Sequence, residues 1–184
     1  MKASVIAVGL IAAAIAISLI VVYTPPPDDF SLENPGWNGL SKLSSELRLR
    51  RVSSIPDERL LLDPSNATLL LIGPETEFTQ REAEFLREFM KRGGIVILMD
   101  DFGSGNALLQ LLEVAPRFNG SLLLDSLFKE RNSALPKIRA PAMNLSEIVL
   151  NYATAIEECG KPLAYSSFYS FLDIDSDGVW DAGE

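Results

Sequence analysis

The longest uncharged apolar stretch of the chain lies near its N-terminus. Residues 3–23 read ASVIAVGLIAAAIAISLIVVY and contain no charged side chain. A helix that rises about 1.5 Å per residue is long enough over this stretch to cross a hydrocarbon layer of about 30 Å. Lys2 precedes the stretch and acidic residues follow it from Asp28 onward, so the positive-inside rule places the N-terminus in the cytoplasm. We therefore expect a single-pass anchor in the cell membrane, with everything beyond Tyr23 outside the cytoplasm.

Two other interpretations of this stretch stay open. A cleaved signal peptide is the first, but the apolar run is long for one and no A-x-A-like site precedes Thr24. A pilin-like leader cut near Ala3 is the second, and it would leave the same apolar helix as the stalk of an assembly. Polymerisation of the protein would be its test.

The remaining chain is long enough for one further domain, because a single core usually needs roughly 100 to 200 residues. Its prolines at 25–27 favour extended, solvated backbone, which indicates a stiff spacer. We expect four segments, which are the cytoplasmic N-terminus with the transmembrane anchor at 1–24, the spacer at 25–37, an α/β domain at 38–172 and an acidic loop at 173–184.

The clearest elements of the expected α/β domain form a β-α-β unit. Residues 68–73 (TLLLIG) are a continuous apolar run between turn residues, which is typical of a strand buried on both faces. Thr79 and Glu82 form a T-x-x-E capping box at the start of an amphipathic helix that ends at the glycines 93–94. The apolar run 95–99 (IVILM) is the next strand, so parallel pairing of the two strands is expected.

Weaker patterns flank this unit. A short helix capped by Asn38 and a first strand at 47–52 are expected before it. A short helix at 107–114 and strands at 122–124 and 148–150 are expected after it.

Composition excludes several classes of function. The chain has a formal net charge of −9 and a pI near 4.6, which argues against binding to nucleic acid. It has one cysteine and no histidine, so an intramolecular disulfide, acid–base chemistry by histidine and a zinc site with histidine ligands are all excluded.

The strongest motif for chemistry is an acidic segment at 173–184 with the spacing of a twelve-residue calcium loop. Its predicted calcium ligands are Asp173, Asp175, Asp177, Val179 through its backbone carbonyl, Asp181 and Glu184. Gly178 allows the sharp turn that such a loop needs. The segment before the loop reads as extended, so we expect a structural calcium site and no helix-loop-helix sensor. The alternative is an acidic hairpin tip that binds nothing tightly.

Acidic residues also follow the two best strands. Glu75 and Glu77 come after the first strand, and Asp100 and Asp101 after the second. Ligands of open α/β sheets bind beyond the carboxyl ends of strands, where carboxylates can hold Mg²⁺ or act as acid and base. The alternative, which we favour, is a set of solvated loop acids. The neighbouring residues 103–106 could receive an anion at a helix N-terminus, but they lack a lysine and are expected to form a plain turn and a helix cap.

Cys159 and three sequons complete the candidates. Two acidic neighbours disfavour the thiolate of Cys159, and no histidine is available as a base, so we do not expect a nucleophile. Asn66, Asn119 and Asn144 each begin an N-glycosylation sequon, and Asn119 is the strongest candidate for a glycoprotein site outside the cytoplasm.

Three segments together carry a resemblance to a known family: NPGWNGLSKL, LLIGPETEFTQREAEFLREFMKRGGIVILMDDFGSGN and FLDIDSDGVWDAGE. The chain resembles an uncharacterised, mostly archaeal, membrane-associated family. The extracytoplasmic domain of that family is similar to class I glutamine amidotransferases and to the periplasmic domain of gliding-motility-type transport proteins. The resemblance implies an α/β fold, a flavodoxin-like three-layer sandwich with a largely parallel sheet, here preceded by one transmembrane helix. The amidotransferase nucleophile and histidine do not carry over.

These observations together lead to a functional expectation. We expect a non-catalytic binding or assembly module of an envelope or transport complex, with an unidentified envelope protein as its partner. The alternatives are a metal-dependent hydrolase that uses the strand-end carboxylates, and a component of surface adhesion or of a filament.

Overall fold

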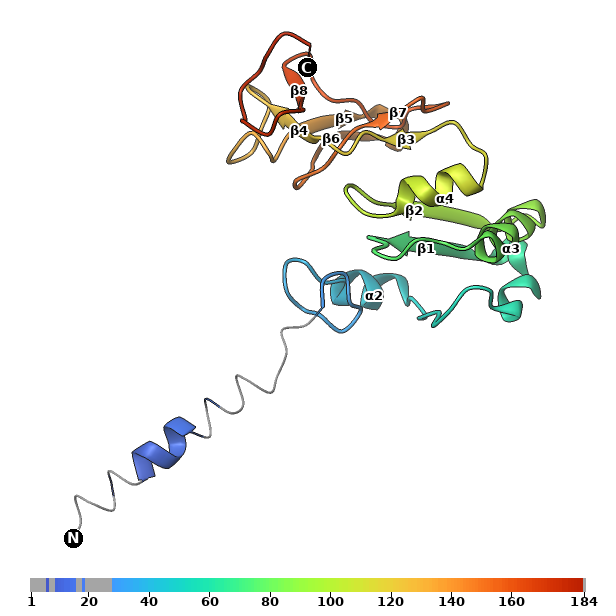
Figure 1. Ribbon diagram of the computed structural model, residues 1–184, viewed down its shortest axis with the longest axis horizontal. Coiled ribbons are helices and arrows are strands. Elements are labelled where there is room, and N and C mark those ends of the chain that lie inside the picture. The colour runs from blue at the N-terminus through green and yellow to red at the C-terminus, as the bar shows by residue number, and fades with distance from the viewer. Residues whose placement is uncertain (1–5, 7–8, 16–17, 19–27, 184) are drawn as a thin grey trace. The chain divides into compact units, whose positions relative to one another are not determined.

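A computed structural model of the chain describes residues 6, 9–15, 18 and 28–183. The chain divides into two compact units, residues 1–51 and 52–184. Figure 1 labels the helices and strands of both units.

Asn34 organises the loop that precedes α2 (Ser41–Leu47) in the first unit. Only 1% of Asn34 is exposed, and its Nδ2 donates to the carbonyl of Asp28 and to Oδ1 of Asn38, both at 3.1 Å. Its Oδ1 accepts the N–H of Gly36 at 2.8 Å. Asn38 therefore serves this loop, and the expectation that it caps the helix is wrong, since the capping position of α2 is Leu40 and has no side-chain cap bond.

The expected strand at 47–52 is also wrong. Arg48 ends α2 in the left-handed conformation with a φ of 53°, and the residues that follow belong to no strand. The chain continues through the 3-10 helices η1 (Glu58–Leu61) and η2 (Pro64–Asn66). No strand among the described residues pairs with this arginine-rich segment, so its alternating pattern does not decide its structure.

The β-α-β unit is confirmed. It consists of β1 (Thr68–Ile72), α3 (Gln80–Lys91) and β2 (Ile95–Met99). The two strands pair in parallel with Leu70 opposite Ile97. The parallel direction follows from the helical crossover, because a connection through a helix returns the chain to the same end of the sheet.

The ends of α3 follow from local chemistry. Thr79 accepts the N–H of Glu82, and the Glu82 carboxylate accepts the N–H of Thr79 at 2.6 Å, so the capping box is complete. After the helix, Gly93 adopts a φ of +95°, and a Cβ on Gly94 would overlap the ring of Phe89. The two glycines therefore let the chain turn tightly over a buried ring and enter β2.

A hydrophobic core lies between α3 and one face of the β1–β2 pair. Its buried side chains are Leu69, Ala83, Phe85, Leu86, Phe89 and Leu108. They come from β1, α3 and the following helix α4 (Gly105–Leu111). Burial of each large side chain in such a core contributes about 1.5–3 kcal/mol to folding.

The opposite face of β2 is not covered within the described part of this unit. Val96 and Leu98 pack against the core, so the alternating strand directs Ile95, Ile97 and Met99 to the other face. These three side chains are 56%, 42% and 38% exposed. Parallel sheets are normally covered on both faces, which makes this apolar face unusual.

The chain beyond α4 forms three antiparallel pairs of short strands, which Figure 1 shows grouped together. β3 (Arg117–Phe118) pairs with β7 (Ile156–Glu157), and β4 (Leu122–Asp125) pairs with β8 (Ser170–Asp173). β5 (Lys137–Ala140) pairs with β6 (Leu145–Val149) around the 3-10 helix η3 (Pro141–Met143).

The expected flavodoxin-like sandwich with a largely parallel sheet is therefore wrong. The described residues form a mixed α/β fold with four two-stranded sheets, of which one is parallel and three are antiparallel. Parallel neighbours need a crossover connection, usually a helix, and the described chain after α4 contains no α-helix that could form one. Only β5 and β6 are joined by a short connection, whereas β3–β7 and β4–β8 pair strands that are distant in the sequence. In β5, buried Ile138 and Ala140 alternate with exposed Arg139, which is the pattern of a strand with one solvated face.

The structure describes only part of the apolar stretch at 3–23. Its described residues 9–15 are helical. No helix in the described part of the chain is both long and apolar enough to cross a membrane. Most of the residues expected to form the transmembrane helix lie outside the described residues.

We predict that Thr79→Ala lowers the free energy of unfolding by about 1 kcal/mol, because the N–H of Glu82 loses its acceptor at the start of α3. Denaturant unfolding of the full chain measures this change. Thr76→Ala is the matched control, since Thr76 is exposed and its side chain makes no hydrogen bond among the described residues, and it should change stability by less than about 0.5 kcal/mol. Equal losses for both variants would contradict the prediction.

Candidate metal centre

The candidate metal centre begins at the last residue of β8. Asp173 lies opposite Leu122 of β4 and is 7% exposed. The neighbouring pairs Leu123–Leu172 and Leu124–Phe171 belong to the same antiparallel ladder, and Leu124 and Phe171 are buried together. The pairing with β4 thus fixes the strand from which the acidic loop leaves.

Backbone hydrogen bonds fold the acidic loop back on itself. Oδ1 of Asp173 accepts the N–H of Gly178 at 3.2 Å, which closes a turn of six residues. Asp175 accepts the N–H of Asp177 at 3.2 Å, and Asp177 accepts the N–H of Val179 at 2.7 Å. Each of the three carboxylates accepts a backbone N–H of the loop. These bonds fix the position of both oxygens of each carboxylate.

Gly178 is the residue that permits this turn. Its φ is +76°, in the left-handed region that residues with a Cβ rarely adopt. No atom lies within 4 Å of the position of a Cβ at Gly178, so its backbone conformation and not crowding favours glycine there. The prediction that glycine supports a sharp turn at this position is confirmed.

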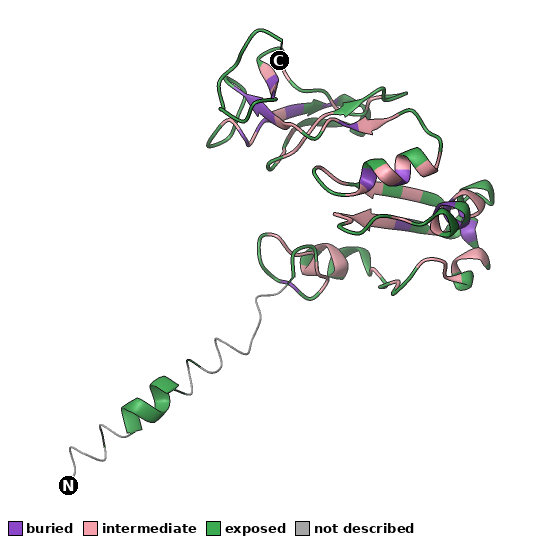
Figure 2. Cartoon of the chain, in the orientation of Figure 1, coloured by how far each residue is buried: buried purple, intermediate pink, exposed green. Residues whose placement is uncertain are grey.

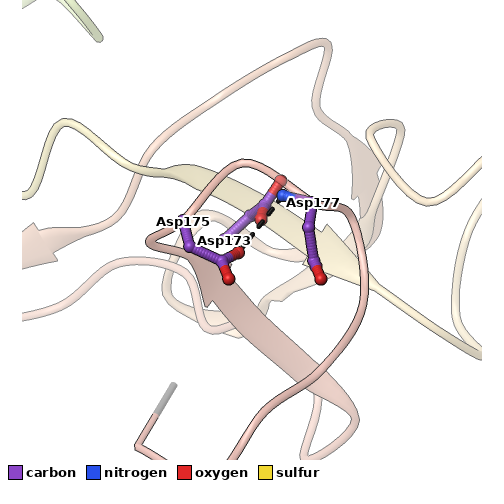
Figure 3. A group of neighbouring side chains, drawn as sticks. All are labelled: Asp173, Asp175 and Asp177. Atoms are coloured by element: carbon purple, nitrogen blue, oxygen red, sulfur yellow. Dashed lines mark hydrogen bonds between the residues drawn. The ribbon is translucent and has the colours of Figure 1, made fainter.

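Three carboxylates meet at this turn, as Figure 3 shows. One oxygen from each of Asp173, Asp175 and Asp177 lies within 4.8 Å of the others, and the described residues contain no other such group of three acidic, cysteine or histidine side chains. Carboxylate oxygens are the donors that Ca²⁺ prefers, and three of them gathered at one turn fit this ion. Asp175 and Asp177 are exposed, so an ion can reach the group from solvent.

The other predicted ligands have different outcomes. Val179 lies in the same loop, where its N–H binds Asp177. Asp181 lies further along and is not part of the group of three. Glu184 lies outside the described residues. The structure thus brings together three of the six predicted ligands, and their roles as ligands stay predictions.

The strand-end acids form a different arrangement. Both oxygens of Asp100 accept backbone N–H groups, from Gly103 at 3.0 Å and from Gly105 at 2.6 Å. A Cβ on Gly105 would lie 2.5 Å from Oδ2 of Asp100, so the glycine allows the close approach. Asp101 accepts the N–H of Phe102 at 2.7 Å. Asp100 therefore shapes the turn into α4.

The segment at 103–106 is tied to the end of β1. The hydroxyl of Ser104 donates to the carbonyls of Pro74 and Thr76, at 2.9 and 2.8 Å. Asn106 exchanges two hydrogen bonds with the backbone of Phe118, which links α4 to β3. This segment is a structural turn, as expected from the sequence, but Ser104 at the capping position of α4 makes no side-chain cap bond.

Asp125, at the end of β4, is a buried carboxylate that the sequence patterns above do not single out. It has no exposed surface, and its Oδ1 accepts the N–H groups of Leu127 at 2.8 Å and Phe128 at 2.6 Å. Its Oδ2 accepts the hydroxyl of Ser167. An aspartate that follows a run of leucines is a signal for a turn of this kind, but nothing in the sequence points to Ser167.

The sequons and the cysteine differ in accessibility. Asn66 and Asn144 are exposed. Asn119 is half-buried, and its side chain binds both Glu157 and the N–H of Ser121. Cys159 is a free, exposed cysteine. Glycosylation stays a prediction, and the surroundings of Asn119 do not favour it over the two exposed sequons.

Fold and site together define a mixed α/β protein with an acidic loop after β8. The chain belongs to the family described as "Domain of unknown function (DUF4350)", whose profile matches residues 33–169. No curated protein and no solved structure matches the chain. The match includes Asn34 and Asp125 and ends before Asp173, so the candidate metal centre lies beyond the matched residues.

We predict that Asp125→Ala lowers the free energy of unfolding by about 3 kcal/mol, because three donors around a buried position lose their acceptor. Asp125→Asn keeps one oxygen for the two N–H groups and should lose only about 1 kcal/mol. Denaturant unfolding of the full chain compares the two variants. Glu77→Ala, at an exposed acidic residue, serves as the control. Equal losses for Asp125→Ala and Asp125→Asn would show that the hydrogen bonds do not account for the effect.

Proposed function

We propose that the protein is a non-catalytic binding or assembly module, attached to a membrane on its extracytoplasmic side and stabilised by Ca²⁺ in its acidic loop. The observation that carries the proposal is the convergence of Asp173, Asp175 and Asp177 on one turn. The role of Ca²⁺ in this proposal is structural. It would neutralise three carboxylates that otherwise repel one another and would hold the end of β8 in place.

The surroundings of a protein outside the cytoplasm suit such a site. Extracellular calcium-binding modules work with dissociation constants of about 0.1–1 mM, so a modest set of ligands is sufficient. Two of the three aspartates are exposed, and an exposed site of this kind is expected to be weak. The acidic loop follows the strand β8 and not a helix, which supports a structural role over a helix-loop-helix sensor.

The non-catalytic part of the proposal rests on the strand-end acids. A metal-dependent hydrolase would need Glu75, Asp100 or Asp101 to present carboxylate oxygens to a metal or to a substrate. Both oxygens of Asp100 instead accept backbone N–H groups of the next turn. The sequence has no histidine that could act in their place. These bonds favour a structural role for Asp100 over a catalytic one.

The binding or assembly part rests on exposed apolar surface. Ile95, Ile97 and Met99 lie on the face of β2 that the described part of this unit leaves exposed. Exposed apolar groups clustered on one face are typical of surfaces that bind another molecule. This exposed apolar face supports an interaction role, including assembly into an envelope complex. A catalytic role would not require such a face.

Membrane attachment is proposed from the apolar stretch at 3–23 and from the charges that flank it. The three segments that resemble a membrane-associated, mostly archaeal family with amidotransferase-like relatives support the same location. Family membership itself extends only to a domain of unknown function.

We predict that Ca²⁺ raises the stability of the full chain. At a free concentration about ten times the dissociation constant, binding to the native state adds about 1.4 kcal/mol. For a chain of this size the melting temperature should rise by about 3–6 °C. Asp175→Ala combined with Asp177→Ala should abolish the rise, because two of the three converging carboxylates are lost.

The control for this experiment is Glu75→Ala combined with Glu77→Ala. It removes the same number of negative charges from exposed positions outside the loop, so it should keep the response to Ca²⁺. Equal responses of the two double variants would mean that Ca²⁺ acts through general screening and would overturn the calcium proposal. Calorimetric titration of the unmodified chain gives the stoichiometry, which should be one ion per chain.

Membrane attachment has its own test. The full chain, expressed with its N-terminal stretch, should stay in the membrane fraction after an alkaline carbonate wash, and a protease added outside the cell should digest the part beyond residue 27. A mass of the mature chain that lacks residues 1–23 would favour the cleaved signal peptide. Release of the chain by the wash would overturn membrane anchoring.

A further inference from the structure

Two loops that are far apart in the sequence meet at one end of the β4–β8 pair. The first follows β4 and carries Leu127 and Phe128, and the second precedes β8 and carries Phe168 and Tyr169. The rings of Phe128 and Tyr169 lie 5.9 Å apart, and those of Phe168 and Tyr169 are also 5.9 Å apart and meet edge to face at 89°. These four residues are called the aromatic patch below.

The aromatic patch is exposed although its backbone is fixed. Phe168 is 97% exposed, Leu127 60%, Tyr169 52% and Phe128 43%. Figure 2 shows buried segments in β4 and exposed loops around it. An aromatic side chain at a loop tip with almost its whole surface in water is uncommon, because burial of such a side chain is favourable.

Asp125 holds the two loops of the aromatic patch together. Its buried carboxylate accepts the N–H groups of Leu127 and Phe128 in the first loop and the hydroxyl of Ser167 in the second. Ser167 in turn accepts the N–H of Tyr169 at 3.0 Å. Three of the four residues of the aromatic patch are therefore positioned through the buried carboxylate of Asp125. The fold itself holds the backbone of the patch in place.

The segment that starts with the first loop of the aromatic patch is basic, although the whole chain is acidic. The net charge of the chain is −9, yet residues 127–139 contain four basic residues and one acidic residue. Glu130, the acidic one, pairs with Lys137 at 3.1 Å. Lys129 and Arg131 are exposed and form no ion pair with any described residue. Two exposed basic residues without an ion pair among the described residues therefore follow Phe128 in the first loop.

We propose that the aromatic patch inserts into the interface of an anionic lipid bilayer, with Lys129 and Arg131 on the lipid headgroups. Tyrosine and other amphipathic rings favour the boundary between headgroups and acyl chains, and basic residues near an anionic surface add to the attraction. The nearly complete exposure of Phe168 describes a protruding tip, which suits insertion into lipid better than docking against a folded protein. This contact goes beyond membrane attachment by the N-terminal stretch and does not require Ca²⁺.

The test uses the full chain in vesicles of phosphatidylglycerol and phosphatidylcholine. Cys159→Ser removes the native thiol, and Phe168→Cys then receives an environment-sensitive fluorophore. Lipids with spin labels on their acyl chains should quench a fluorophore at position 168. The matched control is Leu62→Cys with the same fluorophore, because Leu62 is 83% exposed and lies in the same unit of the chain. Quenching at position 168 should exceed that at position 62 by about three-fold or more, as expected for a residue at the interface.

Charge and partner are tested in the same vesicles. Lys129→Glu combined with Arg131→Glu, or vesicles of phosphatidylcholine alone, should at least halve the quenching at position 168, on the order of the loss expected when the attraction to anionic headgroups is removed. Equal quenching at positions 168 and 62 would overturn the proposal, as would energy transfer between labelled copies without lipid quenching, which would indicate a second copy as the partner.

Two further measurements separate this proposal from the proposed function. Flotation of the vesicles reports whether the chain is attached at all, independently of the fluorophore. Asp175→Ala combined with Asp177→Ala should leave the quenching at position 168 unchanged, since the acidic loop lies at the other end of the β4–β8 pair. A loss of quenching in this variant would contradict the independence of the two sites.

Discussion

The antiparallel pairing of β4 with β8 is the interaction on which the C-terminal part of the structure depends. It places Phe171 against Leu124 in a small buried cluster and aligns the two strands over four residues. Asp125 lies at one end of this pair and Asp173 at the other. One carboxylate thereby holds the aromatic patch, and the other begins the acidic loop. Both proposed sites would lose their geometry together if the two strands separated.

Three strands of the described chain lead into an aspartate that closes the following turn. Asp100 follows β2, Asp125 ends β4 and Asp173 ends β8, and each accepts N–H groups from residues two to five positions further on. A strand that stops leaves backbone donors without partners, and an aspartate at that position satisfies them locally. Asp173 differs from the other two because carboxylate oxygens of Asp175 and Asp177 lie within 4.8 Å of its own. The turn that Asp173 closes is therefore also a group of potential metal ligands.

Local signals account for what the sequence could predict. The capping box at Thr79, the glycines after α3 and the spacing of Asp173, Asp175 and Asp177 each involve residues a few positions apart, and the structure contains all three features. The pairings of the later strands join segments such as Arg117 and Glu157, and no local pattern specifies such partners. From the local pattern of the first β-α-β unit one therefore predicts a sheet whose later strands are also parallel. Local patterns also do not link Asp125 to the aromatic side chains that it positions.

The distance in sequence between β4 and β8 also sets an order of events during synthesis. The β1–α3–β2 unit is complete in the nascent chain long before β8 exists, and its contacts are local, which favours early folding. The hydrogen bond between Asp125 and Ser167 joins residues 42 positions apart. At a synthesis rate of about 5–20 residues per second, the leucine-rich β4 stays without its partner strand β8 for a time on the order of a few seconds. During that interval its apolar side chains can contact wrong partners, so the nascent chain is especially vulnerable to aggregation just before β8 emerges.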